Sequence, residues 1–218
     1  MNSCIYIPIK TNNKRLPGKN TKLLKGKPLY SYLFSTVKSL NAVDAVYIDS
    51  SDESILSIAR NWGFVALKRP EEYNSDCTTG DELLMRVVEQ LDFDIIGLLH
   101  VTSPFLTVET IEMAIQWMTK DITLDSVFGV IPRYNRFWFN MEPINHNIEK
   151  LARTQDLTPV YEETDVYFVR RSSLRKYKKR ICGKFKVMEI NDIESTDIDT
   201  LVDFIAAEAL IDAGLVRL

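Results

Sequence analysis

"CIYIPIKTNNKRLPGKN", residues 4–20, joins a short apolar run to a loop that carries four cations and no acid. The run is short, rich in β-branched residues and ended by charge, which is typical of a buried β-strand. In an open α/β sheet, ligands bind at the carboxyl ends of the strands, and this loop leaves a strand at that end. The loop is therefore expected to face a ligand.

The rest of the chain alternates between strand and helix patterns. Strands are predicted at 3–9, 45–50, 94–101, 125–131, 165–171 and 184–190. Amphipathic helices are predicted at 28–40, 51–63, 78–91, 107–118 and 199–214. This alternation predicts one α/β domain over residues 1–218, a three-layer sandwich around a mostly parallel mixed sheet. The periodicity fails between 133 and 163, so this aromatic, irregular segment is predicted to be a small inserted arm of the dimerisation type.

Composition narrows the class of protein. The chain has 218 residues, of which 45% are hydrophobic and 26% charged, which suits one globular domain. It has neither an apolar run of membrane-spanning length nor a signal-peptide pattern at its start. Cys4, Cys77 and Cys182 are odd in number and widely spaced, which argues against disulfides and zinc and predicts a reducing, cytoplasmic setting. The net charge of -3, with one basic loop, argues against nucleic-acid binding.

Charge is strongly segregated along the chain. Residues 1–43 hold eight lysines and arginines and no acid, whereas residues 187–216 hold eight acids and no cation. If these segments meet, they suit a metal–polyphosphate complex, with cations on the phosphates and acids on the metal. Two solvated surfaces that never meet are the alternative. Neither a Walker A loop nor a dinucleotide fingerprint is present.

The segment "IPIKTNNKRLPGKNTKLLKGKPL", residues 7–29, resembles the opening motif of the acylneuraminate cytidylyltransferase family. This family includes the synthetases of CMP-sialic acid and CMP-3-deoxy-manno-octulosonate. Segments 48–63, 69–84, 98–115 and 194–208 resemble its later motifs, in the expected order. The resemblance implies a nucleotide-diphospho-sugar transferase-like fold. It also implies Mg²⁺-dependent transfer of CMP from CTP to an acidic sugar, with release of pyrophosphate, for cell-surface glycan synthesis by a homodimer.

The resemblance also implies roles for individual residues. Lys14, Lys19 and Asp199 are the expected catalytic residues, with Lys19 reaching a phosphate from an exposed loop. Asp197 and Asp199 are two residues apart, so an extended backbone would point both carboxylates the same way to share Mg²⁺. The expected nucleotide contacts are Pro8, Lys10, Asn12, Asn13, Lys14, Lys19, Asn20, Arg69, Asp76, Thr78 and Thr79. The expected acceptor contacts are His100, Thr102, Ser103, Glu162 and Phe168.

Structural roles compete with several of these assignments. Asp199 could cap the last helix, and Thr78 or Thr79 could cap the helix that follows them. Arg69 could pair with a nearby acid, and His100 could be structural. The arm could pack on its own protein or form a dimer contact. An enzyme of the same fold with another nucleotide or acceptor, and a degenerate nucleotide-binding member, are the alternative functions.

The chain departs from the family pattern at two places. Lys10 replaces an arginine, which keeps the positive charge, and asparagines at 12 and 13 replace Gly-Ser. We therefore still expect this loop to bind the triphosphate. Glu162 stands where sialic-acid enzymes carry a carboxylate-binding arginine, and Phe168 replaces a tyrosine. We therefore predict poor use of N-acetylneuraminate. The acceptor is expected to carry a cationic or hydroxyl-rich group near Glu162, or to place its carboxylate on His100, Arg133 or Arg136.

Overall fold

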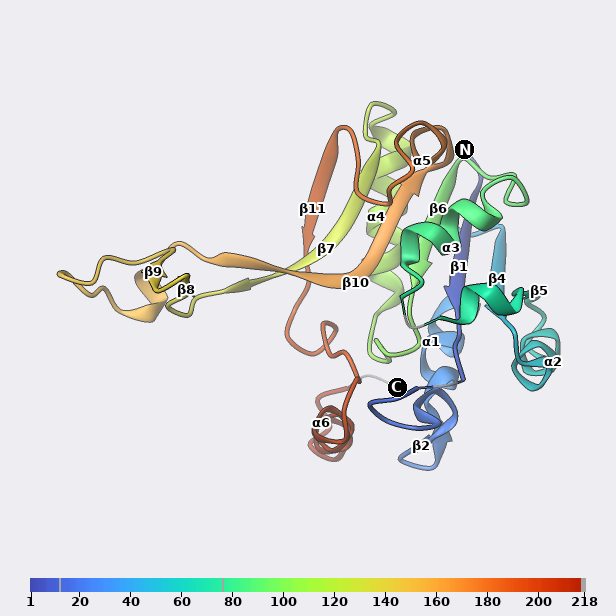
Figure 1. Cartoon of the computed structure of the whole chain (residues 1–218), viewed down its shortest axis with the longest axis horizontal. Coiled ribbons are helices and arrows are strands. Elements are labelled where there is room, and N and C mark those ends of the chain that lie inside the picture. Colours follow the sequence, from blue (N-terminus) through green and yellow to red (C-terminus); the bar gives the residue numbers. More distant parts are fainter. Residues whose placement is uncertain (12, 76, 217–218) are drawn as a thin grey trace.

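A seven-stranded sheet with the order β11-β7-β10-β6-β1-β4-β5 forms the centre of the computed structural model, which describes residues 1–11, 13–75 and 77–216 (Figure 1). Its strands are β1 (Ser3–Pro8), β4 (Ala45–Ser50), β5 (Val65–Lys68), β6 (Ile95–Leu99), β7 (Ser126–Arg133), β10 (Val160–Arg170) and β11 (Phe185–Glu189). Every pairing between neighbours is parallel except those of β10, which is antiparallel to β6 and β7. The predicted mostly parallel mixed sheet is confirmed.

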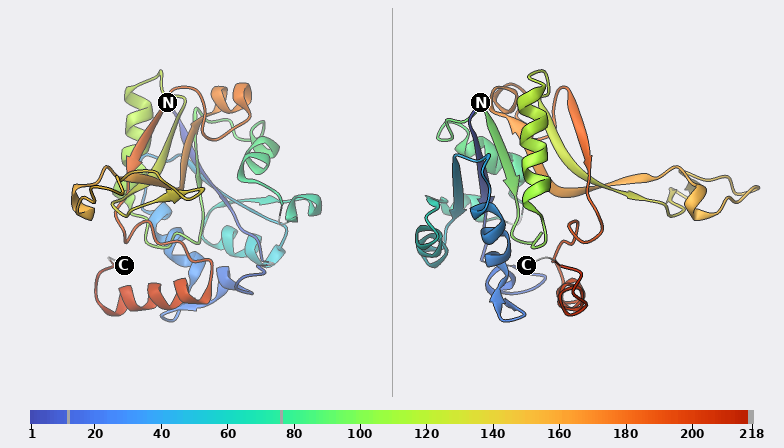
Figure 2. Two further views of the ribbon diagram at one scale, coloured as in Figure 1. Left: turned by 60° about the vertical axis from the view of Figure 1, so that its left-hand side comes forward. Right: turned by 180° about the vertical axis from the view of Figure 1, so that it is seen from behind.

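Helices cover both faces of this sheet (Figure 2). On one face, α1 (Leu29–Lys38), α2 (Glu53–Asn61) and α4 (Val108–Lys120) build the larger apolar core. On the other, α3 (Gly80–Val87) and α5 (Arg171–Tyr177) pack on residues such as Tyr6 and Leu98. The three-layer sandwich follows from the near-continuous apolar runs of the central strands, which must be buried on both sides. Strand β5 and helix α5 were not predicted.

A third apolar cluster joins the two ends of the chain. Helix α6 (Leu201–Asp212) begins at a capping box formed by Thr200 and Asp203. Its buried residue Phe204 packs with Leu16, Leu24 and other residues of the first part of the chain, which includes the short strands β2 (Leu23–Leu24) and β3 (Lys27–Pro28). Figure 1 shows α6 beside this segment. Of the described residues, no helix combines the length and apolar character needed to cross a bilayer.

The segment 133–163 projects from the sheet as a long hairpin (Figure 1). Strands β7 and β10 form its base, and β8 (Trp138–Phe139), β9 (Glu142–Pro143) and the short 3₁₀ helix Thr154–Asp156 lie farther out. The Asn145 side chain connects its two legs, because its Nδ2 donates to the carbonyls of Asn135 at 2.8 Å and Thr158 at 3.1 Å. Hydrogen bonds of this kind order the hairpin although most of its side chains are exposed.

Candidate active site

The carboxyl ends of the parallel strands open at one edge of the sheet. The loops that follow β1, β5 and β6, together with the segment that follows β11, therefore gather at this edge. Because β10 runs in the opposite direction, its amino end reaches the same edge. All the segments in which the sequence predicts site residues are thus brought to one side of the molecule.

The ammonium group of Lys19 connects the basic and acidic segments. Its Nζ donates to Asp199 Oδ1 at 2.6 Å and to the carbonyl of Ile198 at 2.9 Å. Arg15 pairs with the other carboxylate oxygen of Asp199 at 2.6 Å, and Lys25 pairs with Asp212 at 2.7 Å. The alternative in which the two charged segments never meet is therefore wrong.

Two expectations about this contact need correction. Lys19 is only 8% exposed, so it does not project from an exposed loop. Its burial follows from the two acceptors that it satisfies, since a buried ammonium group needs partners. Thr200, rather than Asp199, is the N-cap of α6, so the alternative role of Asp199 as the helix cap is also wrong.

A cationic cavity of about 360 Å³ lies beside this ion pair. The Asn20 side chain shapes its loop by donating to the carbonyl of Lys10 at 2.6 Å, and Gly18 supplies a left-handed backbone with φ of 66°. Asn13 Oδ1 is buried without a hydrogen-bond partner. Concave, cation-lined sites of this kind suit a polyphosphate. The cavity is lined by Lys10, Asn13, Lys14, Arg15, Leu16, Lys19 and Asp199.

Asp197 lies two residues before Asp199, in the same segment. Its Oδ1 is buried without a hydrogen-bond partner. Burial, followed by the negative charge of Asp165, raises the pKa of the Asp197 carboxyl to about 6. Thr102 contributes a side-chain hydrogen bond to Asp197, and its carbonyl accepts from the Ile198 amide at 2.8 Å. An unsatisfied carboxylate oxygen at this edge is suited to a cation.

Metal binding by protein groups alone is not supported at this edge. Within residues 1–11, 13–75 and 77–216, no group of three or more Asp, Glu, His or Cys side chains is placed to hold a metal ion. Asp197 and Asp199 could therefore supply two ligands, with the others coming from a bound molecule or water.

The cationic cavity is not lined by the other predicted nucleotide contacts that the structure describes, which are Pro8, Asn20, Arg69, Thr78 and Thr79. Thr79 is the N-cap of α3 in a capping box with Glu82, and the neighbouring Thr78 is half-buried. Arg69 is 2% exposed and its Nε pairs with Asp49 at 2.9 Å, as the ion-pair alternative expected. Pro8 ends β1. Asn12 and Asp76 lie outside the described residues.

A second, acidic cavity of about 170 Å³ lies at the base of the arm. Glu162 lines it, but its carboxylate is paired with Arg133 at 2.6 Å, and Arg133 also pairs with Asp192 at 3.0 Å. The hydroxyl of Tyr167 donates to Glu163 at 2.7 Å. Thr164 Oγ1 is buried without a partner. The cavity is lined by Ile131, Arg133, Glu162, Glu163, Thr164, Asp165, Ser195 and Asp197.

Phe168 does not belong to this cavity. The residue is fully buried in the core, where its ring lies so close to Gly97 that a Cβ there would come within 2.7 Å of it. The expected acceptor contact by Phe168 is therefore corrected. Its neighbour Tyr167 points to the other face of β10 and carries the hydroxyl near the cavity.

The other expected acceptor residues lie near the end of β6. His100 Nδ1 lies 3.5 Å from the carbonyl of Asp165, at the limit of a hydrogen bond, and Ser103 is 5% exposed. Arg136 donates within the arm to the carbonyl of Ala152 at 2.6 Å. Asp165 was not predicted as a site residue, because an acid at the start of a predicted strand lies at the other edge of the sheet unless that strand is antiparallel.

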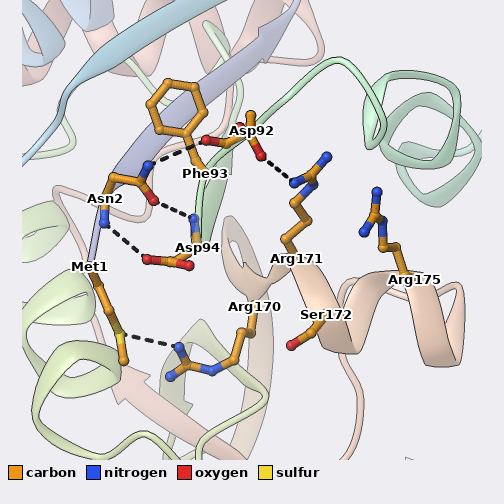
Figure 3. A pocket seen from close by; sticks show the side chains of 9 residues that line it. All are labelled: Met1, Asn2, Asp92, Phe93, Asp94, Arg170, Arg171, Ser172 and Arg175. Atoms are coloured by element: carbon orange, nitrogen blue, oxygen red, sulfur yellow. Dashed lines mark hydrogen bonds and ion pairs between the residues drawn. The ribbon is translucent and has the colours of Figure 1, made fainter.

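A cavity of about 600 Å³ lies at the opposite edge of the sheet (Figure 3). Three arginines line it, but each already has a partner. Arg170 donates to the carbonyls of Leu124 and Met118, Arg171 pairs with Asp92 at 2.6 Å, and Arg175 pairs with Glu89. The predicted site residues lie at the other edge, so this cavity is not the candidate active site.

Comparison with known proteins adds independent information. The sequence model of a family described as "Cytidylyltransferase" matches residues 4–206. The CMP-N,N'-diacetyllegionaminic acid synthase of Legionella pneumophila is 30% identical over 222 residues, which cover 94% of each chain. N-acylneuraminate cytidylyltransferase A of Danio rerio is 28% identical over 90% of this chain. The present chain spans about half the length of that relative, 47%.

Solved structures share the fold. A CMP:2-keto-3-deoxy-manno-octonic acid synthetase complexed with CTP superposes with a TM-score of 0.76 at 18% identity, over 98% of this chain and all of that chain. A 4-diphosphocytidyl-2C-methyl-D-erythritol synthase from Anaerococcus prevotii superposes with a TM-score of 0.69 at 14% identity, over 97% and 96% of the chains. At such identities the likeness shows the fold alone, and it confirms the nucleotide-diphospho-sugar transferase-like architecture.

Asp197→Asn should stabilise the protein at neutral pH. The folded-state pKa of Asp197, about 6, exceeds its ordinary value of 3.8, so the ionised carboxyl costs stability above pH 6 and this cost vanishes below about pH 4. We expect the variant to gain about 1–3 kcal/mol at pH 7.5 and to lose part of the pH dependence between 4 and 6. Urea unfolding at several pH values would measure both.

The matched control is Glu149→Gln, which neutralises an exposed acid on the arm and should change stability little. An Asp197→Asn variant that unfolds at the same urea concentration as the parent at pH 7.5, or at a lower one, would show that ionisation of Asp197 does not destabilise the folded protein.

Proposed function

The chain belongs to the cytidylyltransferase family, and from this membership we propose that it transfers CMP from CTP to an acidic sugar with release of pyrophosphate, for cell-surface glycan synthesis. The membership confirms the resemblance of residues 7–29 to the acylneuraminate cytidylyltransferases. The observation that carries the proposal is that the cationic cavity is lined by Asp199 and the acidic cavity by Asp197, two residues away in the same segment. Nucleotide and acceptor would thus meet at the 197–199 segment.

In this proposal the triphosphate of CTP lies in the cationic cavity. Lys10, Lys14 and Arg15 line that cavity, and their charges would hold the β- and γ-phosphates and stabilise the departing pyrophosphate. The acceptor hydroxyl oxygen attacks the α-phosphorus, the bond from that phosphorus to the bridging oxygen breaks, and the hydroxyl proton is lost. Catalysis of such a reaction consists mainly of positioning and charge stabilisation.

Lys19 has a different part in this arrangement. Its ammonium group is occupied by Asp199 Oδ1 and the carbonyl of Ile198, so it would fix the acidic segment relative to the phosphate loop. A phosphate oxygen at the cavity could share the third proton of the ammonium group.

We also propose that Asp197 and Asp199 hold Mg²⁺. The buried, unpartnered Oδ1 of Asp197 fits a hard cation. The Asp199 carboxylate lines the cavity proposed for the phosphates, whose oxygens would complete the coordination, and Asp197 lines the neighbouring acidic cavity. When bound, the ion would neutralise charge on the phosphates and on the pyrophosphate. For Asp199 to bind metal, Arg15 must release it, and the Arg15 side chain is 69% exposed and so can move.

The acceptor is proposed to bind in the acidic cavity at the base of the arm. Arg133 pairs with Glu162, and the other carboxylates that line this cavity belong to Glu163, Asp165 and Asp197. These groups favour hydroxyl or ammonium groups over a carboxylate.

A cytoplasmic setting remains a prediction from the cysteine pattern.

A homodimer is proposed because the arm exposes a large apolar surface. An exposed apolar surface on a projecting hairpin usually meets a partner, and closed two-fold pairing is the commonest solution. The exposed fractions range from 47% to 86% for Tyr134, Trp138, Phe139, Met141, Ile144, Ile148 and Leu151.

Lys14→Ala should lower kcat/KM for CTP, because it removes a cation from the phosphate cavity. The loss should correspond to about 2–4 kcal/mol of transition-state stabilisation. Pyrophosphate release would measure this, first across the four nucleoside triphosphates with a panel of acidic sugars to establish the substrates. Lys120→Ala, at the end of α4, is the control. Equal kcat/KM for the two variants would remove Lys14 from the site.

N-acetylneuraminate should be a poor acceptor compared with sugars that offer hydroxyl or amino groups to the acidic cavity. Steady-state kinetics with CTP and Mg²⁺ would compare it with 3-deoxy-octulosonates and amino-substituted analogues. A kcat/KM above about 10⁴ M⁻¹s⁻¹ for N-acetylneuraminate, a value typical of a natural substrate, would contradict this expectation.

Substituting Phe139 and Met141 by serine should convert the dimer to a monomer, because these side chains are 68% and 86% exposed on the arm. Sedimentation velocity should give about twice 25.1 kDa for the parent chain and one such mass for the variant. Ile122→Ser, 67% exposed after α4, is the control and should remain dimeric. A monomeric parent would refute the proposed dimer.

A further inference from the structure

A buried network at the end of β4 has no role in the chemistry described above. Its centre is Asp49, which is fully buried. The Tyr6 hydroxyl donates to Asp49 Oδ2 at 2.5 Å, and Arg69 Nε donates to the same oxygen at 2.9 Å. The Arg86 guanidinium donates to Oδ1. Two strands, a loop and a helix thus converge on one carboxylate.

The backbone of Asp49 extends this network to the phosphate loop. Its carbonyl accepts from the Ile9 amide at 2.8 Å and from Arg69 NH2 at 2.8 Å. Ile9 directly precedes Lys10 of the cationic cavity, and Arg69 opens the segment 69–79. Arg86 lies on α3, the helix that Thr79 caps. Asp49 therefore connects three segments in which nucleotide contacts are expected.

The network is charged and shielded from water. The side chains of Arg69 and Arg86 are 2% and 10% exposed, and both pair with the single carboxylate of Asp49. Arg86 Nε is buried without a hydrogen-bond partner, and its guanidinium lies 5.7 Å from the centre of the Tyr73 ring. Removing one member of a buried ion network perturbs the groups that it held. Loss of Arg86 would leave Asp49 Oδ1 without this donor and would break the contact between Asp49 and α3, while Arg69 and Tyr6 could still hold Oδ2.

We propose that Asp49 and Arg86 are positioning residues of the nucleotide subsite. They hold Arg69, the start of the phosphate loop and helix α3 in the arrangement that CTP binding requires, and they do not contact CTP themselves. The inference rests on the proposed function, because it takes CTP as the ligand of this edge. Asp49 and Arg86 would act by fixing the conformation of the site, whereas Lys14 would act on the phosphates directly through its charge.

The test is calorimetric titration of CTP into Arg86→Met, with no acceptor present. We expect the Kd for CTP to rise by about tenfold or more. In a separate assay with acceptor, kcat at saturating CTP should stay within about threefold of the parent. Arg86→Lys should restore the Kd to within about threefold, because Arg86 donates to Asp49 through one nitrogen, which an ammonium group can replace. Tyr6→Phe removes one hydrogen bond to Asp49 and should raise the Kd less.

The matched control is Arg170→Met, at the opposite edge of the same sheet. Arg170 donates to the carbonyls of Leu124 at 3.0 Å and Met118 at 2.9 Å, so its loss should lower the thermal midpoint without changing the Kd for CTP. If Arg86→Met behaves like this control, the network only stabilises the fold and the inference is wrong. If Arg86→Met does not fold, Tyr6→Phe decides, and an unchanged Kd for that variant overturns the inference.

Failure of the proposed function gives a different result. A parent protein that binds no CTP and forms no CMP-sugar with any acidic acceptor overturns the proposed function and this inference with it. A parent that binds CTP, beside an Arg86→Met variant that binds it equally well, overturns the inference alone.

Discussion

The candidate site depends on one buried ammonium group. Lys19 joins the phosphate loop to the 197–199 segment, 180 residues away along the chain. Its donors satisfy the carbonyl of Ile198 and the Asp199 oxygen that Arg15 does not contact, and leaving such acceptors unpaired at the edge of the core is costly. The apolar cluster around Leu16, Ile198 and Phe204 adds packing beside the same contact. The ion pair fixes which atoms face each other, and the apolar cluster keeps water from competing for them.

Most of the fold could be predicted because its central strands are apolar runs and its longer helices are amphipathic. Strand β5 has four residues of mixed exposure, and α5 has seven, so neither is long enough to show a period. In the arm, β8 and β9 have two residues each and bury no face, so no alternation of apolar and polar residues is needed there. A periodic pattern of apolar residues is present in the sequence only where a helix or strand packs against the core.

Residues that share one loop or one extended segment could be assigned from the sequence, and residues joined by tertiary contacts could not. Lys10, Lys14 and Arg15 follow one strand and line one cavity. The burial of Lys19 and the pairing of Glu162 with Arg133 depend on distant partners. Phe168 illustrates a finer limit, because a shift of one residue in a strand exchanges the two faces. The motif alignment placed Phe168 at the acceptor, whereas Phe168 is buried in the core and the Tyr167 hydroxyl, on the other face of β10, donates to Glu163 of the acidic cavity.

The charges of the candidate site are neutralised by its own side chains, and this shapes how a ligand can enter. Arg15 and Lys19 share the two oxygens of Asp199, so the cations suited to phosphate already contact the acid suited to metal. Arg15 is 69% exposed and Lys19 is buried, so only the Arg15 pair can be exchanged at little cost. A polyphosphate with its metal ion would take Arg15 from Asp199 and give Asp199 a new cation in return. In the proposed complex, binding would be an exchange of cationic partners at Asp199, with the buried Lys19 holding that acid in place throughout.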